Sequence, residues 1–194
     1  MPKIVDHDER RRMIAAAVTD IAATEGLGEV SFRTVAERAG VSVSLVQHYF
    51  GDKANLLKTT LQIQSETMDA HLAAKLADLG DTPGPLAVLR AVAAAFLPVD
   101  EISRRSMLVY QGFAAAAFTD DSLRHSEMFA NGRQLIDFFA DQLAQLRGDE
   151  PHTTEDATGL LSLVLGLSMS VLLTQISPSE ATAVLDRHIE RLAR

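Results

Sequence analysis

The sequence has no cysteine and no tryptophan, and it has only two tyrosines. Without cysteine there is no disulfide scaffold, thiolate zinc site, iron–sulfur cluster or cysteine nucleophile, which fits a reducing compartment. The longest nearly apolar run, residues 160–173, is 14 residues long and contains serines, so it predicts a buried helix that is too short to cross a bilayer. The first twelve residues lack the apolar segment of a secretory signal. We therefore expect a cytoplasmic protein with no membrane association.

The sequence also lacks an excess of basic residues, since the formal net charge of the 194 residues is −8. The charge is unevenly distributed, however. The first 60 residues hold eight basic and eight acidic side chains, so all the net negative charge falls on the remainder. A neutral segment on an acidic body permits local contact with DNA but gives no broad positive surface.

Helical periodicity runs along most of the chain, and the strict alternation of half-buried strands is rare. Glycine and proline separate the helical segments. The pattern predicts an all-α protein in which three short N-terminal helices precede a bundle of about six longer ones. We place a domain boundary between residues 52 and 53, giving domains 1–52 and 53–194. The expected helices are 8–25, 31–39 and 42–50, followed by 53–80, 85–97, 101–117, 121–146, 153–176 and 179–193.

Residues 34–50, TVAERAGVSVSLVQHYF, hold two short helices and a turn that contains glycine. A helix-turn-helix that contacts DNA inserts the N-terminal end of its second helix into the major groove. Here that end carries Ser42, Ser44 and Gln47, which can hydrogen-bond to bases, and Val43, which can contact a thymine methyl group. The alternative is an ordinary helical hairpin of an all-α protein.

Residues 35–56, VAERAGVSVSLVQHYFGDKANL, resemble the TetR/AcrR family of bacterial transcriptional regulators. The resemblance extends over about residues 8–58. It rests on a hydrophobic–alanine pair, an Ala-Gly-Val-Ser turn, an aromatic pair, a lysine and a leucine, here Val35-Ala36, Ala39-Gly40-Val41-Ser42, Tyr49-Phe50, Lys53 and Leu56. It implies an N-terminal three-helix DNA-binding domain and a C-terminal helical domain for ligand sensing and dimerisation.

The residue at position 47 departs from the common pattern of that family. Many members have a tyrosine there that contacts phosphate, whereas this chain has Gln47. The segment VQHYFGDK is more similar to another branch of the family, which resembles the choline-responsive repressors of the betaine pathway, than to the members with that tyrosine. Gln47 can pair with adenine N6 and N7, or it can face solvent.

The resemblance assigns DNA-contacting roles by position. Arg33 and Thr34 would meet phosphate or a groove edge, and Ser42, Val43 and Ser44 would enter the major groove. His48 and Tyr49 would approach the backbone, although core packing is the alternative for Tyr49. Lys53 would pair with phosphate at the start of the long helix. The partners implied are a double-stranded operator with an inverted repeat, a second copy of the chain and a small-molecule effector.

The effector site needs a cavity lined by apolar groups and a few polar ones. Ordinary core packing is the alternative for each candidate. A quaternary ammonium ligand would need an aromatic cage. With no tryptophan and two tyrosines, phenylalanine would have to supply most of that cage, so we do not adopt choline as the effector. The candidate lining residues are Met68, Phe96, Met107, Tyr110, Gln111, Phe113, Ala114, Phe129 and Met169.

A stripe of small residues recurs every four positions in the segment 153–176. Such a stripe lets two helices approach closely. The resemblance implies that the last two helices form the homodimer face, which agrees with the stripe, and packing within one chain is the alternative. The candidate dimer residues are Thr158, Ser162, Gly166, Ser170 and Thr174, with Val184 on the final helix.

An enzyme is the main competing class, but none of the common catalytic or nucleotide-binding motifs is present and the histidines are scattered. We therefore expect no catalytic residue, no metal site and no cofactor. The function we predict is that of a ligand-responsive regulator, by expectation a repressor, that is released from its operator by a small molecule. The alternative is an all-helical interaction protein without sequence-specific DNA binding.

Overall fold

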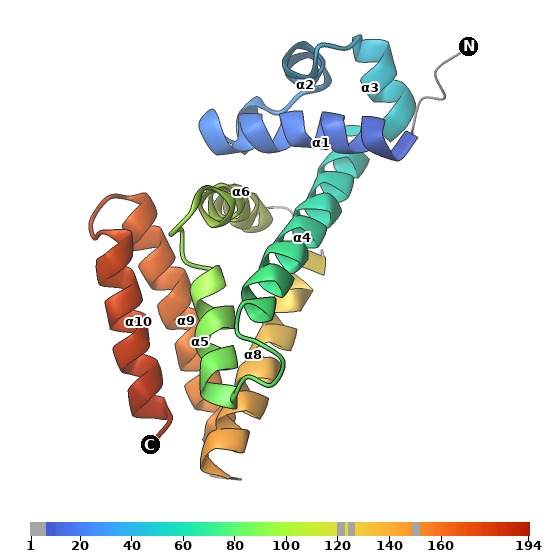
Figure 1. The fold of residues 1–194 in the computed structure, drawn as a ribbon. Coiled ribbons are helices and arrows are strands. Elements are labelled where there is room, and N and C mark those ends of the chain that lie inside the picture. Colours follow the sequence, from blue (N-terminus) through green and yellow to red (C-terminus); the bar gives the residue numbers. More distant parts are fainter. Residues whose placement is uncertain (1–6, 120–122, 124–126, 149–151) are drawn as a thin grey trace. The chain divides into compact units, whose positions relative to one another are not determined.

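Nine α-helices and one short 3-10 helix make up the secondary structure of the described part of the chain (Figure 1). The computed structural model describes residues 7–119, 123, 127–148 and 152–194, with side chains outside the description at 127–130. The helices are α1 (His7–Thr24), η1 (Leu27–Glu29), α2 (Phe32–Ala39), α3 (Val43–Phe50), α4 (Lys53–Ala77), α5 (Pro85–Ala95), α6 (Glu101–Ala117), α8 (Glu127–Arg147), α9 (Thr153–Leu172) and α10 (Pro178–Leu192). The predicted all-α fold class is confirmed.

The chain divides into two compact units. The first unit contains the described parts of residues 1–67 and 108–128, and the second contains those of 68–107 and 129–194. Helix α4 contributes residues to both units. This division follows packing, so the functional boundary between residues 52 and 53 stays a prediction.

The core of the first unit forms because α1 places Ile14, Val18 and Ile21 on one face, at the spacing of a buried helical stripe. These side chains pack with buried residues of α2, α3, α4 and α6, among them Val46 and Phe113. Within this unit α1 packs against α2, and α2 packs against α3. The short helices α2 and α3 are therefore held by apolar contacts on their inner sides.

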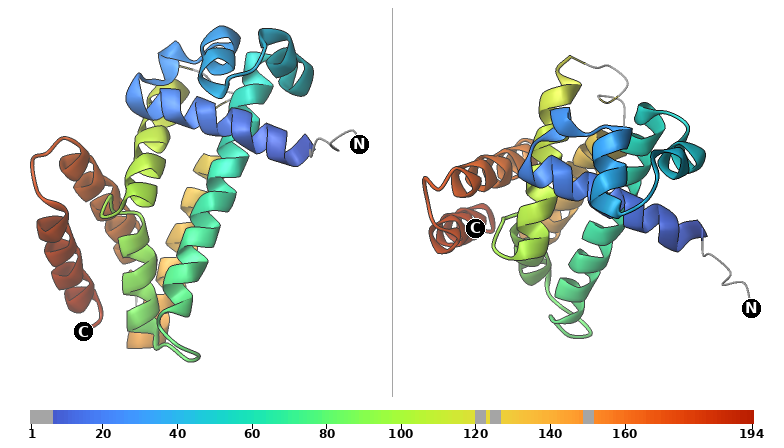
Figure 2. Two further views of the ribbon diagram at one scale, coloured as in Figure 1. Left: turned by 45° about the horizontal axis from the view of Figure 1, so that its top comes forward. Right: turned by 90° about the horizontal axis from the view of Figure 1, so that it is seen from above.

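The core of the second unit joins α5, α8, α9 and α10. Helix α10 begins at Pro178 after the N-cap Ser177 and buries Ala181, Leu185 and Ile189 at intervals of four. Helices α9 and α10 pack against each other and both contact α5. The two views of Figure 2 also show α9 and α10 running side by side.

Most of the predicted helix boundaries agree with the structure to within three residues, but some elements differ. The 3-10 helix η1 is absent from the sequence-based prediction. Helix α4 ends at Ala77 rather than near Gly80. The start predicted for the helix 121–146 lies outside the described residues, and the structure places α8 from Glu127 to Arg147.

Helix α9 ends at Leu172, four residues earlier than predicted, so Thr174 is not part of the helix. The end has the hydrogen bonds of a Schellman motif, in which the Gln175 N–H donates to Ser170 O and the Thr174 N–H donates to Val171 O. Thr174 takes the left-handed conformation, with φ of 56°, that glycine usually supplies. Because no glycine stands at this position, the ending could not be predicted from sequence.

Candidate nucleic-acid interface

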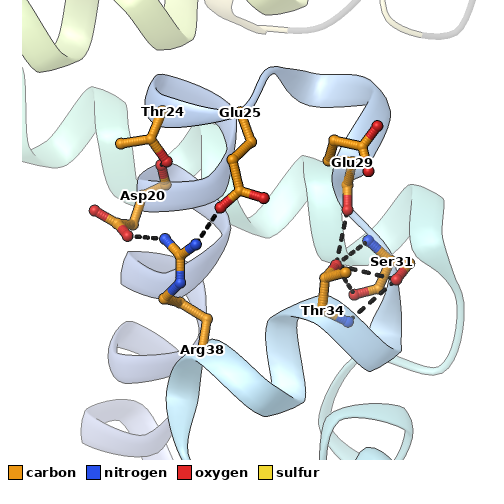
Figure 3. Close-up of polar contacts among 7 residues, drawn as sticks. All are labelled: Asp20, Thr24, Glu25, Glu29, Ser31, Thr34 and Arg38. Carbon is orange, nitrogen blue, oxygen red and sulfur yellow. Dashed lines mark hydrogen bonds and ion pairs between the residues drawn. The ribbon is translucent and has the colours of Figure 1, made fainter.

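Helix α2 starts where it does because Ser31 and Thr34 form a capping box. The Ser31 side chain accepts from the Thr34 N–H at 3.2 Å, and the Thr34 hydroxyl accepts from the Ser31 N–H at 3.0 Å. The Thr34 hydroxyl also donates to Glu29 O at 2.7 Å (Figure 3). Its hydrogen is therefore already used within the chain, and the phosphate contact predicted for Thr34 stays a prediction.

The turn between α2 and α3 depends on Gly40, which has φ of 66° at the end of α2. Ser42 then caps α3, since its hydroxyl accepts from the Leu45 N–H at 3.2 Å. Both features were predicted from the sequence. Together they set where α3 begins, and thus which side chains occupy its first turn.

Helix α3 has a buried face and an exposed face. Val46 and Phe50 are buried in the core of the first unit. Val43, Ser44 and Gln47 are exposed on the other side, and Val43 is 40% exposed although it is aliphatic. An exposed face of small, polar and methyl-bearing side chains at the start of the second helix is the chemistry that base contacts require.

An ion-pair cluster fastens α2 to α1. The Arg38 guanidinium donates one N–H to Asp20 Oδ2 and another N–H to Glu25 Oε1 (Figure 3). The hydrogen bond with Glu25 and then that with Asp20 raise the pKa of Arg38 above its ordinary value. The charge of Arg38 is thus paired with two carboxylates of the first unit, whereas Arg33 is an exposed cation of α2 without an ion-pair partner among the described residues.

All nine predicted DNA-contacting residues lie in the first unit, on α2 and α3, at the turn between them and at the start of α4. Thr34 and Tyr49 are partly buried. The other seven are exposed, namely Arg33, Ser42, Val43, Ser44, Gln47, His48 and Lys53. Whether they contact DNA stays a prediction.

Two residues of this unit were missed by the sequence analysis. His7 Nδ1 lies 3.0 Å from the Tyr49 hydroxyl, and Arg38 makes the cluster with α1. No local pattern pointed to the first contact, because 42 positions separate its partners. For Arg38, a basic residue in the last turn of a short helix gave no indication of a partner 18 positions earlier.

The predicted effector-lining residues are divided between the units. Tyr110, Gln111, Phe113 and Ala114 belong to the first unit, where Phe113 is part of the core. Burial raises the pKa of the Tyr110 hydroxyl. The side chain of Phe129 lies outside the described residues. The remaining candidates, Met68, Phe96, Met107 and Met169, belong to the second unit.

An open surface groove of about 560 Å³ lies in the second unit, between the α5–α6 and α9–α10 connections. None of the predicted effector-lining residues lines it. Its lining residues are Pro98, Val99, Asp100, Glu101, Arg104, Val171, Thr174, Ile176, Ser177 and Pro178. The effector site therefore stays a prediction.

The predicted dimer residues lie mostly on one exposed face of α9. Thr158, Ser162 and Gly166 are exposed and Ser170 is partly exposed. Large apolar side chains accompany them, since Met169 is 38% exposed and Val184 of α10 is 44% exposed. The fifth member of the stripe, Thr174, lies in the turn after α9. The face is thus uncovered within one chain.

The helix-turn-helix with an exposed polar second helix defines the class of DNA-binding transcriptional regulators. Comparisons with known proteins agree. The family described as bacterial regulatory proteins, tetR family, matches residues 14–60, and the family described as BetI-type transcriptional repressor, C-terminal, matches residues 85–194. The chain therefore belongs to the TetR family of bacterial transcriptional regulators, with a C-terminal domain of the BetI type.

Individual relatives extend over nearly the whole chain. The HTH-type transcriptional regulator PksA of Bacillus subtilis is 27% identical over 99% of this chain and 94% of its own length. BetI of Burkholderia thailandensis is 31% identical over 86% of this chain and 84% of its own length. Both relatives are transcriptional regulators, in agreement with the class that the fold defines.

Solved structures share the fold. A transcriptional regulator from Rhodococcus sp. Rha1 has a TM-score of 0.80 and 29% identity, and the alignment covers 94% of this chain and 95% of that one. A regulator from Saccharomonospora viridis, solved in complex with choline, has a TM-score of 0.80 at 19% identity, covering 94% and 96% of the two chains. At that identity the second likeness concerns the fold alone.

Proposed function

We propose that this regulator is a cytoplasmic repressor that binds an inverted-repeat operator as a homodimer and is released by a small molecule. The observation that carries the proposal is the exposed face of α3, where Val43, Ser44 and Gln47 stand free of the core. In a dimer, two such helices would enter successive major grooves about one turn of B-DNA apart. Lys53 and Arg33, both exposed, supply cations for phosphate contacts at the edges of the groove.

The dimer is supported by the uncovered face of α9 and α10. The small side chains Thr158, Ser162 and Gly166 allow close approach, and Met169 and Val184 offer apolar area for burial. The match of residues 85–194 to the BetI-type repressor family supports both the dimer and repression as the mode of action.

Release by an effector requires two states with different affinities for that effector. Helix α4 is continuous from Lys53, beside the proposed DNA contacts, to residues of the second unit. An effector that favours one tilt of α4 would change the spacing between the two α3 helices of a dimer. We therefore place the coupling in α4, the helix that contributes residues to both units.

The effector is proposed to be an apolar small molecule or a quaternary ammonium compound. The second class is supported by the BetI-type match and by the choline found in the Saccharomonospora regulator. Thermal shifts of this protein with choline and with a library of lipophilic compounds distinguish the two classes. A flat response to both would count against effector sensing.

The test of operator binding begins with selection of duplexes from a random library by the purified protein. An inverted repeat among the selected sequences supports the proposal, whereas recovery of no common sequence favours the alternative of an interaction protein without specific DNA binding. Affinity for the selected duplex should fall steeply with salt, because phosphate contacts release counterions. Affinity that ignores salt would contradict the phosphate contacts.

Two variants separate base contacts from phosphate contacts. Gln47→Ala should weaken binding by about 1–3 kcal/mol and relax the sequence preference at one position of each half-site. Lys53→Ala should weaken binding to all sequences alike and lower the salt dependence. The exposed Gln145 of α8 provides a control, since Gln145→Ala should leave binding unchanged. An unchanged preference in Gln47→Ala would show that Gln47 faces solvent.

A further inference from the structure

The first residue of α1 contacts the proposed DNA-binding helix. His7 Nδ1 lies 3.0 Å from the Tyr49 hydroxyl of α3, and the two rings are 5.7 Å apart between centroids. The edge of the His48 ring meets Tyr49 from the same helix, with centroids 5.6 Å apart and planes at 84°. His7 is exposed and Tyr49 is partly buried, and the hydrogen bond between them is exposed at the surface of the first unit.

The chemistry of this contact depends on where one hydrogen lies. A tyrosine hydroxyl has a single hydrogen to donate, and a neutral imidazole has one donor nitrogen and one acceptor nitrogen. If His7 Nδ1 is unprotonated, it accepts the Tyr49 hydrogen, and the hydroxyl then presents only lone pairs to other groups. If Nδ1 carries a hydrogen, it donates to the Tyr49 oxygen, and the hydroxyl hydrogen is free for another acceptor. A phosphate oxygen is an acceptor only, so the second arrangement alone lets Tyr49 bind phosphate.

We propose that His7 is a positioning residue for operator binding, because a hydrogen on its Nδ1 turns the Tyr49 hydroxyl hydrogen toward the DNA backbone. The proposal rests on the proposed DNA-binding function and assigns a role to a residue outside the helix-turn-helix. The imidazolium form always carries that hydrogen. The neutral ring must adopt the Nδ1–H tautomer to do the same, so binding persists at higher pH but is weaker.

Charged residues and a second histidine accompany the His7–Tyr49 contact on the helices that form it. On its own helix, His7 is followed by Asp8 and Glu9, with Arg10 and Arg11 one turn later. Helix α3 contributes Tyr49 and His48, and α4 begins with Lys53. Among these residue types only histidine ordinarily changes charge between pH 6 and pH 8. Separate variants of His7 and His48 therefore show which of the two imidazoles a pH dependence of binding needs.

The experiment measures the dissociation constant of the full-length protein for its selected duplex at pH 6, 7 and 8 and constant ionic strength. We expect binding about three- to tenfold tighter at pH 6 than at pH 8, which is the net effect of one typical hydrogen bond. In His7→Asn the amide nitrogen stands close to the place of Nδ1 and does not titrate, so affinity should become independent of pH. In Tyr49→Phe the pH dependence should also disappear, together with part of the affinity at pH 6.

Two controls complete the design. His48→Asn should retain the pH dependence, and His152→Asn, at an exposed position before α9, should behave as the wild type. Long-range proton–nitrogen spectra of labelled histidine give an independent readout, since Nδ1 of His7 should carry a hydrogen in the DNA complex.

The outcomes are distinguishable. If the wild type selects no DNA at any pH, the proposed function fails and this inference falls with it. If the wild type binds specifically but equally well at pH 6 and 8, or if its pH dependence survives in His7→Asn, the proposed function stands and the role of His7 is overturned. Loss of the dependence in His7→Asn and Tyr49→Phe but not in His48→Asn supports the proposal.

Discussion

Asp100 shows at the scale of one residue how a short connection is fixed. Its carboxylate accepts from the Ser103 N–H at 2.8 Å and caps α6, while its other oxygen lies 3.2 Å from Lys75 Nζ and 3.4 Å from His71 Nε2 of α4. Partial burial opposes the ionised form, but the Ser103 N–H, the Ser103 hydroxyl, Lys75 and His71 outweigh it and lower the pKa of Asp100 to about 2. The side chain thus joins two helices of the second unit.

This lowered pKa predicts a pH-dependent stability. The ionised carboxylate stabilises the folded state above its unfolded pKa of 3.8, and this contribution is lost as the pH falls toward 2. Asp100→Ala should lower the free energy of unfolding by about 1 kcal/mol at pH 7, as for loss of a helix cap. Urea unfolding at pH 7, 4.5 and 3 should show the difference from wild type shrinking as the solution is acidified.

Asp100→Asn is the matched comparison, because it keeps a capping oxygen and removes the charge. It should lose less stability than Asp100→Ala at pH 7. An equal effect of Asp100→Ala at pH 7 and pH 3 would contradict the stabilising role of the carboxylate charge.

At the scale of the element, two helix ends use the same backbone conformation with different residues. Gly40 ends α2 with φ of 66° and Thr174 follows α9 with φ of 56°. Glycine adopts this conformation without steric cost, whereas a β-branched residue is strained there. At Gly40 the backbone conformation and not steric crowding disfavours a side chain, since a Cβ placed there would have no atom within 4 Å.

The same rule therefore predicts opposite effects at the two sites. Gly40→Ala should lower the free energy of unfolding by about 1 kcal/mol, and Thr174→Gly should raise it by a similar or smaller amount, because glycine also loses more entropy on folding. Gly40→Asn should be tolerated better than Gly40→Ala. Thermal and urea unfolding test these changes, and a stabilising Gly40→Ala would contradict the left-handed turn.

The elements also show which parts of the structure were predictable from sequence. Helix existence followed from periodicity, and the starts of α2 and α3 from the serines at positions 31 and 42, because a capping serine acts locally. The end of α9 was predicted wrongly because Thr174 adopts the left-handed conformation, which is rare for threonine. The contact of His7 with Tyr49 was beyond prediction, since it depends on tertiary packing. The exposure of Ser42, Val43, Ser44 and Gln47 was predictable because it follows from the period of one short helix and its cap.

At the scale of the whole molecule, the proposed dimer accounts for apolar side chains that one chain leaves uncovered on α9 and α10. Gly166 offers a clean test, since a Cβ at this position would have no atom within 4 Å inside the chain. Gly166→Leu should therefore fold normally and shift the protein toward monomer in sedimentation, because the larger side chain would hold the two copies apart. Gly132→Leu in α8 is the matched control, as a Cβ there is equally unopposed. A wild-type mass for Gly166→Leu would count against this face.

The described chain has two clusters of buried side chains that share no member. Helices α2 and α3 contribute only to the first cluster, and α5, α9 and α10 contribute only to the second. Substitutions in the second cluster can therefore accumulate without removing an apolar contact behind the exposed face of α3.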